Sequence, residues 1–65
     1  MTKWYGFLVQ FSQGTTPRRS FLVRRFSEEM VQEAIETGLI VEWGKTSDGE
    51  VMYAITAKGK DERDN

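Results

Sequence analysis

The stretch from Ser27 to Thr56 constrains the fold most, because signals for a helix pass directly into signals for a β-hairpin. Ser27 is a favourable N-cap residue, and Gly38 stands where a glycine can end a helix in the left-handed conformation. The apolar residues between these two positions recur with the spacing of one helical face, and they are Met30, Val31, Ala34 and Ile35. The pattern therefore predicts a helix over residues 28–37.

Two apolar runs rich in β-branched and aromatic residues follow this helix. They cover residues 39–43 and 51–56, and the segment KTSDGE between them has strong turn chemistry. A two-residue turn would mix large and small side chains on each face. A three-residue loop over 47–49 instead pairs Trp43 with Tyr53 and gathers the large side chains on one face. We therefore expect a type I turn with its glycine in the left-handed position, forming a bulge.

The segments that precede the helix favour strands. Every second residue in residues 3–12 is apolar over one face, namely Tyr5, Phe7, Val9 and Phe11. Residues 20–26 form a second apolar run, and Gly14 and Pro17 interrupt the pattern between the two segments. The expected fold class is α+β: a small ββαββ domain with an antiparallel sheet and one helix packed on one face.

The length of the chain allows one domain. A chain of 65 residues offers one hydrophobic core, so residues 1–57 are expected to form a single compact domain. Residues 58–65 have no apolar period and are expected to be a flexible charged tail. One helix covers only one face of the sheet, which would leave Trp4 and Leu8 on the other. That face is either exposed to solvent or covered by a second copy of the chain. A homodimer is therefore one of the open alternatives.

Two residue types that carry much enzyme chemistry are missing. The chain has no cysteine and no histidine, which excludes thiol chemistry and removes the commonest general base. The helix carboxylates are expected to face solvent, where they keep ordinary pKa values. We therefore expect a protein that is not an enzyme and that needs no cofactor or metal. No apolar run reaches membrane-spanning length and no signal peptide is visible, so we expect no membrane partner and a cytoplasmic location.

Charge is distributed unevenly along the chain. Four arginines fall within one short segment, and they are Arg18, Arg19, Arg24 and Arg25. These side chains are candidate phosphate ligands for nucleic acid, the alternative being that they solubilise the chain or pair with its own glutamates. No basic residue occurs from Phe26 to Gly44. The outward carboxylates there, together with two apolar side chains, form a candidate surface for a protein partner: Trp4, Leu8, Glu29, Glu33 and Glu36. A solvated acidic helix face is the alternative.

Residues 31–60 carry the elements GLI, DGE and Y-A-I-T-A-K-G in that order. This series resembles the C-terminal half of winged-helix transcription regulators, in which a recognition helix leads into a two-stranded wing. The resemblance implies DNA binding, with the helix in the major groove and the wing on the backbone. The outward residues of the helix are acidic, however, and the segments before it favour strands, so no base-reading role transfers to any residue.

These observations favour a small non-enzymatic binding or regulatory module that acts through its surface on a protein partner, as accessory proteins of the phage type do. The alternative is a winged-helix-like nucleic-acid-binding regulator that contacts phosphates through the arginine-rich segment.

Overall fold

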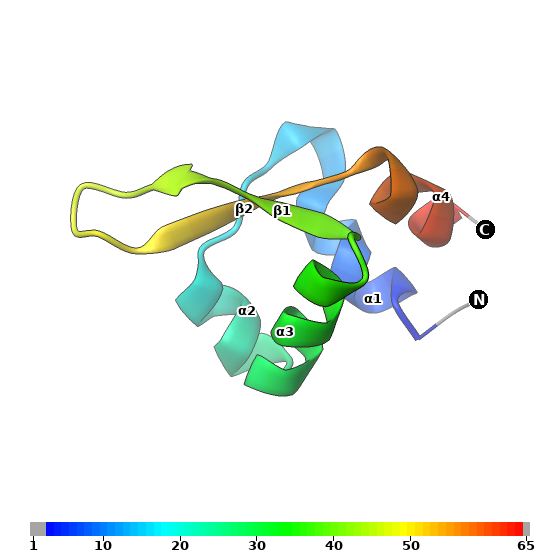
Figure 1. The fold of residues 1–65 in the computed structure, drawn as a ribbon, viewed down its shortest axis with the longest axis horizontal. Coiled ribbons are helices and arrows are strands. Elements are labelled where there is room, and N and C mark those ends of the chain that lie inside the picture. The colour runs from blue at the N-terminus through cyan, green and yellow to red at the C-terminus, as the bar shows by residue number, and fades with distance from the viewer. Residues whose placement is uncertain (1–2, 65) are drawn as a thin grey trace.

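The computed structural model describes residues 3–64, which fold into four α-helices, one 3-10 helix and one two-stranded antiparallel sheet (Figure 1). In chain order the elements are α1 (Tyr5–Leu8), η1 (Val9–Gly14), α2 (Arg19–Arg25), α3 (Glu28–Glu36), β1 (Ile40–Lys45), β2 (Val51–Ile55) and α4 (Ala57–Asp64). The fold is therefore a small mixed α+β domain. None of the helices in this range is long and apolar enough to cross a membrane.

The core lies where the helices meet the base of the hairpin. The ring of Phe7 is fully buried, and its centroid lies 5.6 Å from that of Trp4, 5.7 Å from that of Phe11 and 5.1 Å from that of Phe26. These are ordinary spacings for stabilising aromatic pairs. The other buried apolar side chains come from α1, α2, α3, both strands and the residue before β1, and they are Leu8, Leu22, Val31, Ala34, Leu39, Ile40 and Tyr53. The tip of the hairpin projects away from this core (Figure 1).

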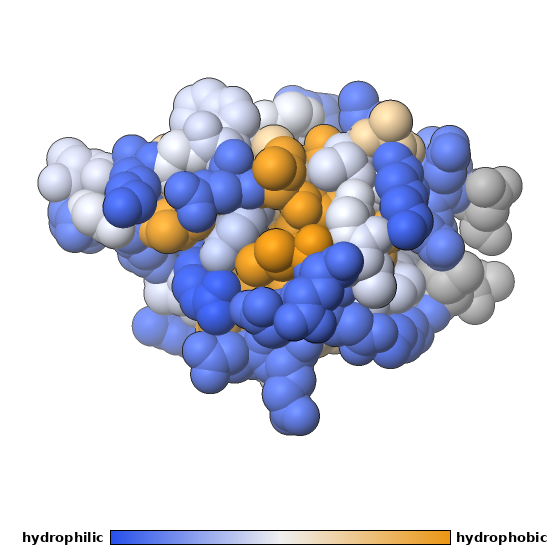
Figure 2. Space-filling model, in the orientation of Figure 1, coloured by the Kyte–Doolittle hydropathy of each residue, from blue (hydrophilic) through white to orange (hydrophobic). Residues whose placement is uncertain are grey.

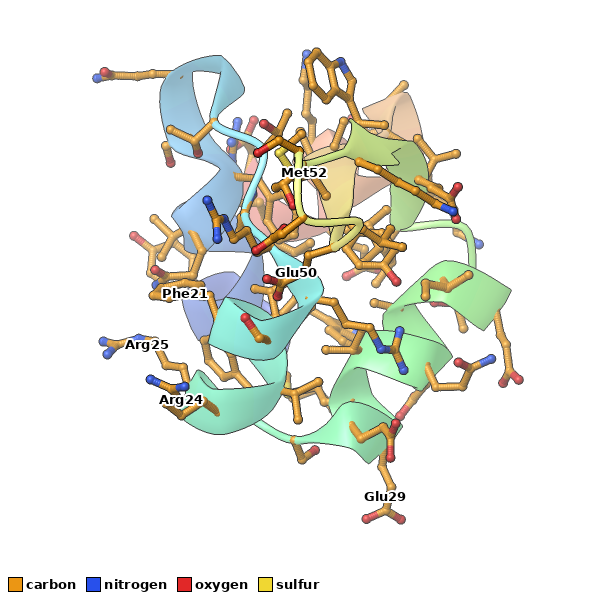
Figure 3. All side chains as sticks on the ribbon, turned by 90° about the vertical axis from the view of Figure 1, so that its left-hand side faces the viewer. Phe21, Arg24, Arg25, Glu29, Glu50 and Met52 are labelled. Atoms are coloured by element: carbon orange, nitrogen blue, oxygen red, sulfur yellow. The ribbon has the colours of Figure 1, made fainter. Side chains whose placement is uncertain are left out.

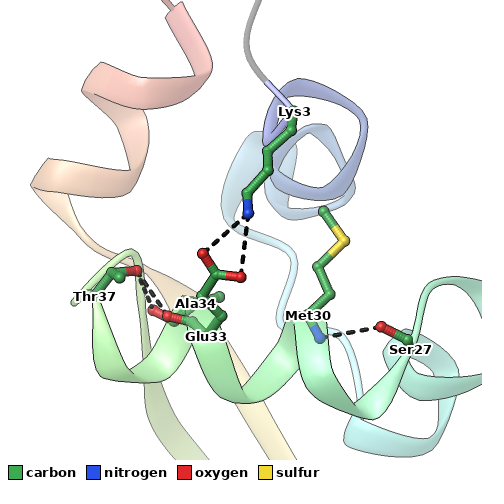
Figure 4. Close-up of polar contacts among 6 residues, drawn as sticks. All are labelled: Lys3, Ser27, Met30, Glu33, Ala34 and Thr37. Atoms are coloured by element: carbon green, nitrogen blue, oxygen red, sulfur yellow. Dashed lines mark hydrogen bonds and ion pairs between the residues drawn. The ribbon is translucent and has the colours of Figure 1, made fainter.

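The helix predicted over residues 28–37 is confirmed as α3. The Ser27 hydroxyl accepts a hydrogen bond from the Met30 backbone N–H at 3.1 Å (Figure 4), which satisfies one orphan donor of the first turn. Gly38 has φ +79°, and the Leu39 N–H beyond it donates to the Ala34 carbonyl at 2.9 Å. The helix therefore ends in the left-handed glycine that its sequence indicates.

The hairpin turn is confirmed, but the predicted pairing of Trp43 with Tyr53 is wrong. Thr46 N–H donates to the Glu50 carbonyl at 2.8 Å, which closes a three-residue loop in which Gly49 has φ +89°. Further from the turn, a bulge inserts Trp43 as an extra residue, so that Glu42 lies opposite Tyr53. A slip of one residue reverses the face of each side chain. Tyr53 is consequently buried, whereas the Trp43 side chain is 63% exposed.

The strands expected over residues 3–12 and 20–26 are wrong, because both segments are helical. The buried residues of the first segment are spaced i, i+3, i+4 and i+7, and they are Trp4, Phe7, Leu8 and Phe11. That spacing is the template of one helical face, and it prevails over the alternation of period two that the same aromatics also show. The order ββαββ therefore does not describe this chain, and α3 is one of four helices in residues 3–64.

The expected partner surface of Trp4 and Leu8 is also wrong, because both side chains belong to the core. The helical path of α1 turns them towards the other helices, whereas the expected strand would have left them on an uncovered sheet face. The apolar face that made a homodimer one of the alternatives is therefore not exposed.

The described part of the expected tail, residues 58–64, belongs to helix α4, whereas Asn65 lies outside the described residues. The Thr56 hydroxyl accepts from the Gly59 N–H at 3.0 Å, as an N-cap residue does. Gly59 is buried against the Leu39 carbonyl. α4 thus docks through a glycine rather than through an apolar stripe, and this explains why its sequence shows no apolar period.

Replacing Gly59 with alanine is expected to destabilise the fold. A Cβ atom there would lie 2.2 Å from the Leu39 carbonyl oxygen and 2.7 Å from Ile55 Cγ1, and neither neighbour is a flexible chain end. We expect a loss of about 1–3 kcal/mol in the free energy of unfolding, measured by urea titration. The matched control is Gly6→Ala in α1, where a new Cβ meets nothing within 4 Å and should stabilise the helix by about 0.5–1 kcal/mol. Equal stability of the two variants would contradict this account of α4 docking.

Candidate functional site

Helix α3 presents a continuous acidic face to solvent. Val31 and Ala34 are fully buried on its inner side. Its exposed residues are acidic or amide in type, and they are Glu28, Glu29, Gln32, Glu33 and Glu36. We call these five residues the acidic α3 surface. The expectation that Glu29, Glu33 and Glu36 point outward is confirmed, because a helix with one buried stripe must turn its other side to water.

Two cations from neighbouring segments neutralise part of this surface. Lys3 Nζ lies 3.0 Å from Glu33 Oε2 (Figure 4), and Arg19 Nη2 lies 3.3 Å from Glu28 Oε1. Glu29 and Glu36 form no ion pair within residues 3–64. The two carboxylates without cationic partners therefore lie at positions separated by two turns of one helix.

An apolar strip borders the acidic α3 surface. Figure 2 shows apolar atoms exposed across the middle of the molecule, where β1 crosses above α3, with hydrophilic side chains below them along the helix. Val41 of β1 is 52% exposed, and Ile35 of α3 is partly buried. A partner that lies on α3 would therefore meet carboxylates beside an apolar edge.

The arginines predicted to bind nucleic acid do not form one patch. Arg18 Nη1 lies 3.7 Å from Glu50 Oε2 of the hairpin. Arg19 turns towards α3 and pairs with Glu28. Arg24 and Arg25 in the last turn of α2 project from the side of α2 that faces away from α3 (Figure 3). Two of the four guanidinium groups are thus engaged within the fold, and only the other two lie free of ion pairs in residues 3–64.

Arg19 connects three elements. Its Nη1 donates to the Tyr53 hydroxyl of β2 at 2.8 Å, while its Nη2 contacts Glu28 of α3. The hydrogen bond to Tyr53, together with the nearby Glu28 carboxylate, raises the pKa of Arg19. We conclude that Arg19 holds α2, α3 and β2 together and is the least suited of the four arginines to leave the fold for an external phosphate.

Glu50 fastens the hairpin to the start of α2, a role that sequence reasoning missed. Its Oε1 accepts a hydrogen bond from the Ser20 backbone N–H at 2.8 Å. The Ser20 hydroxyl and then this N–H lower the pKa of the Glu50 carboxyl. No local signal identifies the contact, because the two residues are thirty positions apart.

The charged side chains of residues 3–64 all lie at or near the surface. No buried side chain in residues 3–64 is polar or charged, and no group of three His, Cys, Asp or Glu residues in this range could hold a metal ion. The glutamates of α3 lie on the surface. The arrangement therefore suits the binding of a charged partner.

Comparison with models of known protein families, with curated proteins and with solved structures finds no match to this chain.

Stability should depend on pH through Glu50. Its pKa lies below the ordinary value of 4.5 in the folded protein, so its ionised form stabilises the fold at neutral pH. This stabilisation is lost as the pH falls below that value, since protons then bind more readily to the unfolded chain. We expect Glu50→Gln to be less stable than the parent at about pH 7 and to approach it at about pH 3, as measured by urea unfolding.

Asp48 also has a lowered pKa, mainly because it accepts a hydrogen bond from the Thr46 hydroxyl. Both proteins in this comparison retain Asp48, and its charge opposes the lowering of the Glu50 pKa by Ser20. Glu29→Gln is the matched control, because Glu29 forms no ion pair in residues 3–64. A stability difference for Glu50→Gln that does not change with pH would contradict the role given to its carboxylate.

Proposed function

We propose that this chain is a small non-enzymatic binding module that presents the acidic α3 surface to a positively charged surface of a protein partner. The observation that carries the proposal is the composition of that surface. Its five exposed residues include four glutamates and no cation, and Glu29 and Glu36 have no ion-pair partner in residues 3–64. Carboxylates without an ion-pair partner on a helix remain available as acceptors for the arginine and lysine side chains of a partner, although Glu36 also accepts a hydrogen bond from the Gln32 side-chain amide at 3.3 Å.

The same charges disfavour nucleic acid as the partner of α3. A helix that reads the major groove brings Arg, Lys, Asn or Gln to base edges and phosphates. α3 would bring Glu28, Glu29, Glu33 and Glu36 instead. Carboxylates pressed against phosphates are repelled, and the neutralisation by Lys3 and Arg19 reaches only two of the four.

The order of the elements supports the proposal of a winged-helix arrangement. A helical segment is followed by a single antiparallel bridge between Arg18 and Met52, then by the pair α2 and α3, and then by the hairpin. The sequence elements of the resemblance also contact one another. Thr56 N–H donates to the Leu39 carbonyl at 3.0 Å, and Gly59 packs on that same carbonyl. In such an arrangement α3 takes the position of a recognition helix, and its acidic face favours a basic protein there.

A nucleic-acid-binding regulator is the second candidate, and the exposed end of α2 favours it. Arg24 and Arg25 project together beside Phe21, whose side chain is 45% exposed (Figure 3). Two phosphate contacts with one stacking ring would give weak binding that falls steeply with salt. The cytoplasmic location expected from the sequence stays a prediction.

Reversing charge on α3 tests the leading proposal. Affinity capture from an extract of the encoding organism is carried out at about 100 mM salt, where exposed charges still act over about 10 Å. We expect the parent to retain a basic protein that the double variant Glu29→Lys/Glu36→Lys loses. The control Glu42→Lys/Asp61→Lys makes the same change of net charge at exposed positions outside α3 and should retain it. Retention of the same protein by both variants would show that α3 is not the contact surface.

A gel shift with duplex DNA separates the two candidate functions. We expect no retardation by the parent at about 50 mM salt, where phosphate contacts are strongest. The variant Glu29→Lys/Glu36→Lys, which removes two repulsive carboxylates, should bind more duplex than the parent. Retardation by the parent that Arg24→Gln/Arg25→Gln abolishes would instead establish the second candidate and reject the first.

A further inference from the structure

The bulge in β1 has a consequence for the outer face of the hairpin. Because Trp43 is the inserted residue, its indole points away from the core and becomes one wall of a groove of about 480 Å³. The turn from Gln13 to Thr16 also lines the groove, and so do Phe11 and Ile55. This volume lies within the range of about 300–1,000 Å³ that ligand sites occupy.

The charged residues that line this groove are both cations. They are Lys60 and Arg63, on adjacent turns of α4, and no carboxylate lines the groove. Arg63 Nε lies 3.0 Å from Asp64 Oδ1, which orients the guanidinium group. Lys60 is exposed and forms no ion pair within residues 3–64. A ligand here would therefore meet both positive charge and an indole.

Two features of the rim are energetically unfavourable, namely an exposed indole and a residue in the left-handed conformation. Trp43 is 63% exposed, the largest exposure among the large apolar side chains of residues 3–64. Gln13 has φ +59°, a left-handed conformation that costs a residue with a side chain about 1–2 kcal/mol. Strained backbone conformations and exposed apolar groups concentrate at binding sites.

We propose that this groove binds an acidic peptide segment of another protein, with an apolar side chain of the peptide packed on Trp43 and an adjacent carboxylate paired with Lys60 and Arg63. Figure 1 shows η1 above the hairpin and α3 below it, so this site lies across the hairpin from the acidic α3 surface. It recognises charge of the opposite sign and does not rest on the function proposed for α3.

The surroundings favour a peptide over a nucleic-acid strand. Beyond the two cations of the groove, α4 carries Lys58 in its first turn and three carboxylates, Asp61, Glu62 and Asp64. These carboxylates would repel the continuous row of phosphates of an extended strand, whereas a peptide with one or two carboxylates needs only the local positive charge. The apolar lining of the groove likewise suits an aliphatic or aromatic side chain.

The test uses the whole chain and three acetylated, amidated peptides of sequence GSFEEGS, GSFQQGS and GSAEEGS. Binding is followed by NMR through the indole N–H of Trp43 and the backbone amides of residues 13–16 and 60–63. We expect saturable shifts with the first peptide and at least tenfold weaker binding with each of the other two. Loss of two charge-assisted contacts, or of one packed ring, accounts for a change of that size.

Two variants act on the two halves of the groove. Trp43→Ala and Lys60→Gln/Arg63→Gln should each weaken binding of GSFEEGS at least tenfold, while their circular dichroism spectra stay like that of the parent. The control Phe21→Ala/Arg24→Gln changes an exposed ring and a cation on α2 and should bind as the parent does. Because the groove variants alter different elements, misfolding of one still leaves the other as a test.

Absence of saturable shifts at millimolar GSFEEGS, or equal binding of the neutral peptide GSFQQGS, would overturn the proposal. Tighter binding of a ten-residue oligothymidylate to the same amides would also overturn it. So would self-association of the chain in sedimentation that Trp43→Ala abolishes, because a second copy would then occupy the groove. Glu29→Lys/Glu36→Lys should leave peptide binding unchanged, so failure here and failure of the α3 proposal are distinguishable.

Discussion

The structure depends on the junction at the Leu39 carbonyl, where four elements meet. This oxygen accepts hydrogen bonds from the Thr56 backbone N–H and from the Thr56 hydroxyl, each at 3.0 Å. The single proton of this hydroxyl is shared with the Gly38 carbonyl, which lies at 2.6 Å, and the hydroxyl oxygen accepts from Gly59 N–H. The end of α3, both strands at the base of the hairpin and the first turn of α4 are therefore held at one point. The junction therefore fixes the position of the acidic α3 surface relative to the groove that Trp43, Lys60 and Arg63 line.

Local signals identified the elements whose structure is decided within a few residues. The N-cap at Ser27, the glycine that ends α3 and the three-residue loop of the hairpin all agree with the sequence, because each depends on neighbouring backbone groups. The N-terminal segment was misassigned because its aromatics match two periods at once. Only packing against other helices decides between them, and the buried set from Trp4 to Phe11 has the helical spacing.

The candidate surfaces likewise include features that the local sequence predicts and features that depend on distant contacts. The outward glutamates of α3 could be predicted, since the facing of a helix follows from its own sequence. The ion pairs of Arg18 and Arg19 could not, because their partners Glu50 and Glu28 come from other elements. The exposure of Trp43 was not predicted, because one inserted residue reverses the face on which its side chain lies. The sequence LIVEW contains no signal that indicates a bulge. The exposure of Trp43 changes the outer side of the hairpin from a bare strand into the wall of a groove.

The close packing of α1 against α4 brings the first and last described turns of the chain together, at the end of the molecule opposite the hairpin tip (Figure 1). A short linker could therefore join the two ends, and the chain could be reopened in the exposed loop over residues 47–49. Such a circularly permuted molecule would retain the Leu39 junction unchanged. The covalent order of the segments is thus separable from the contacts that hold them.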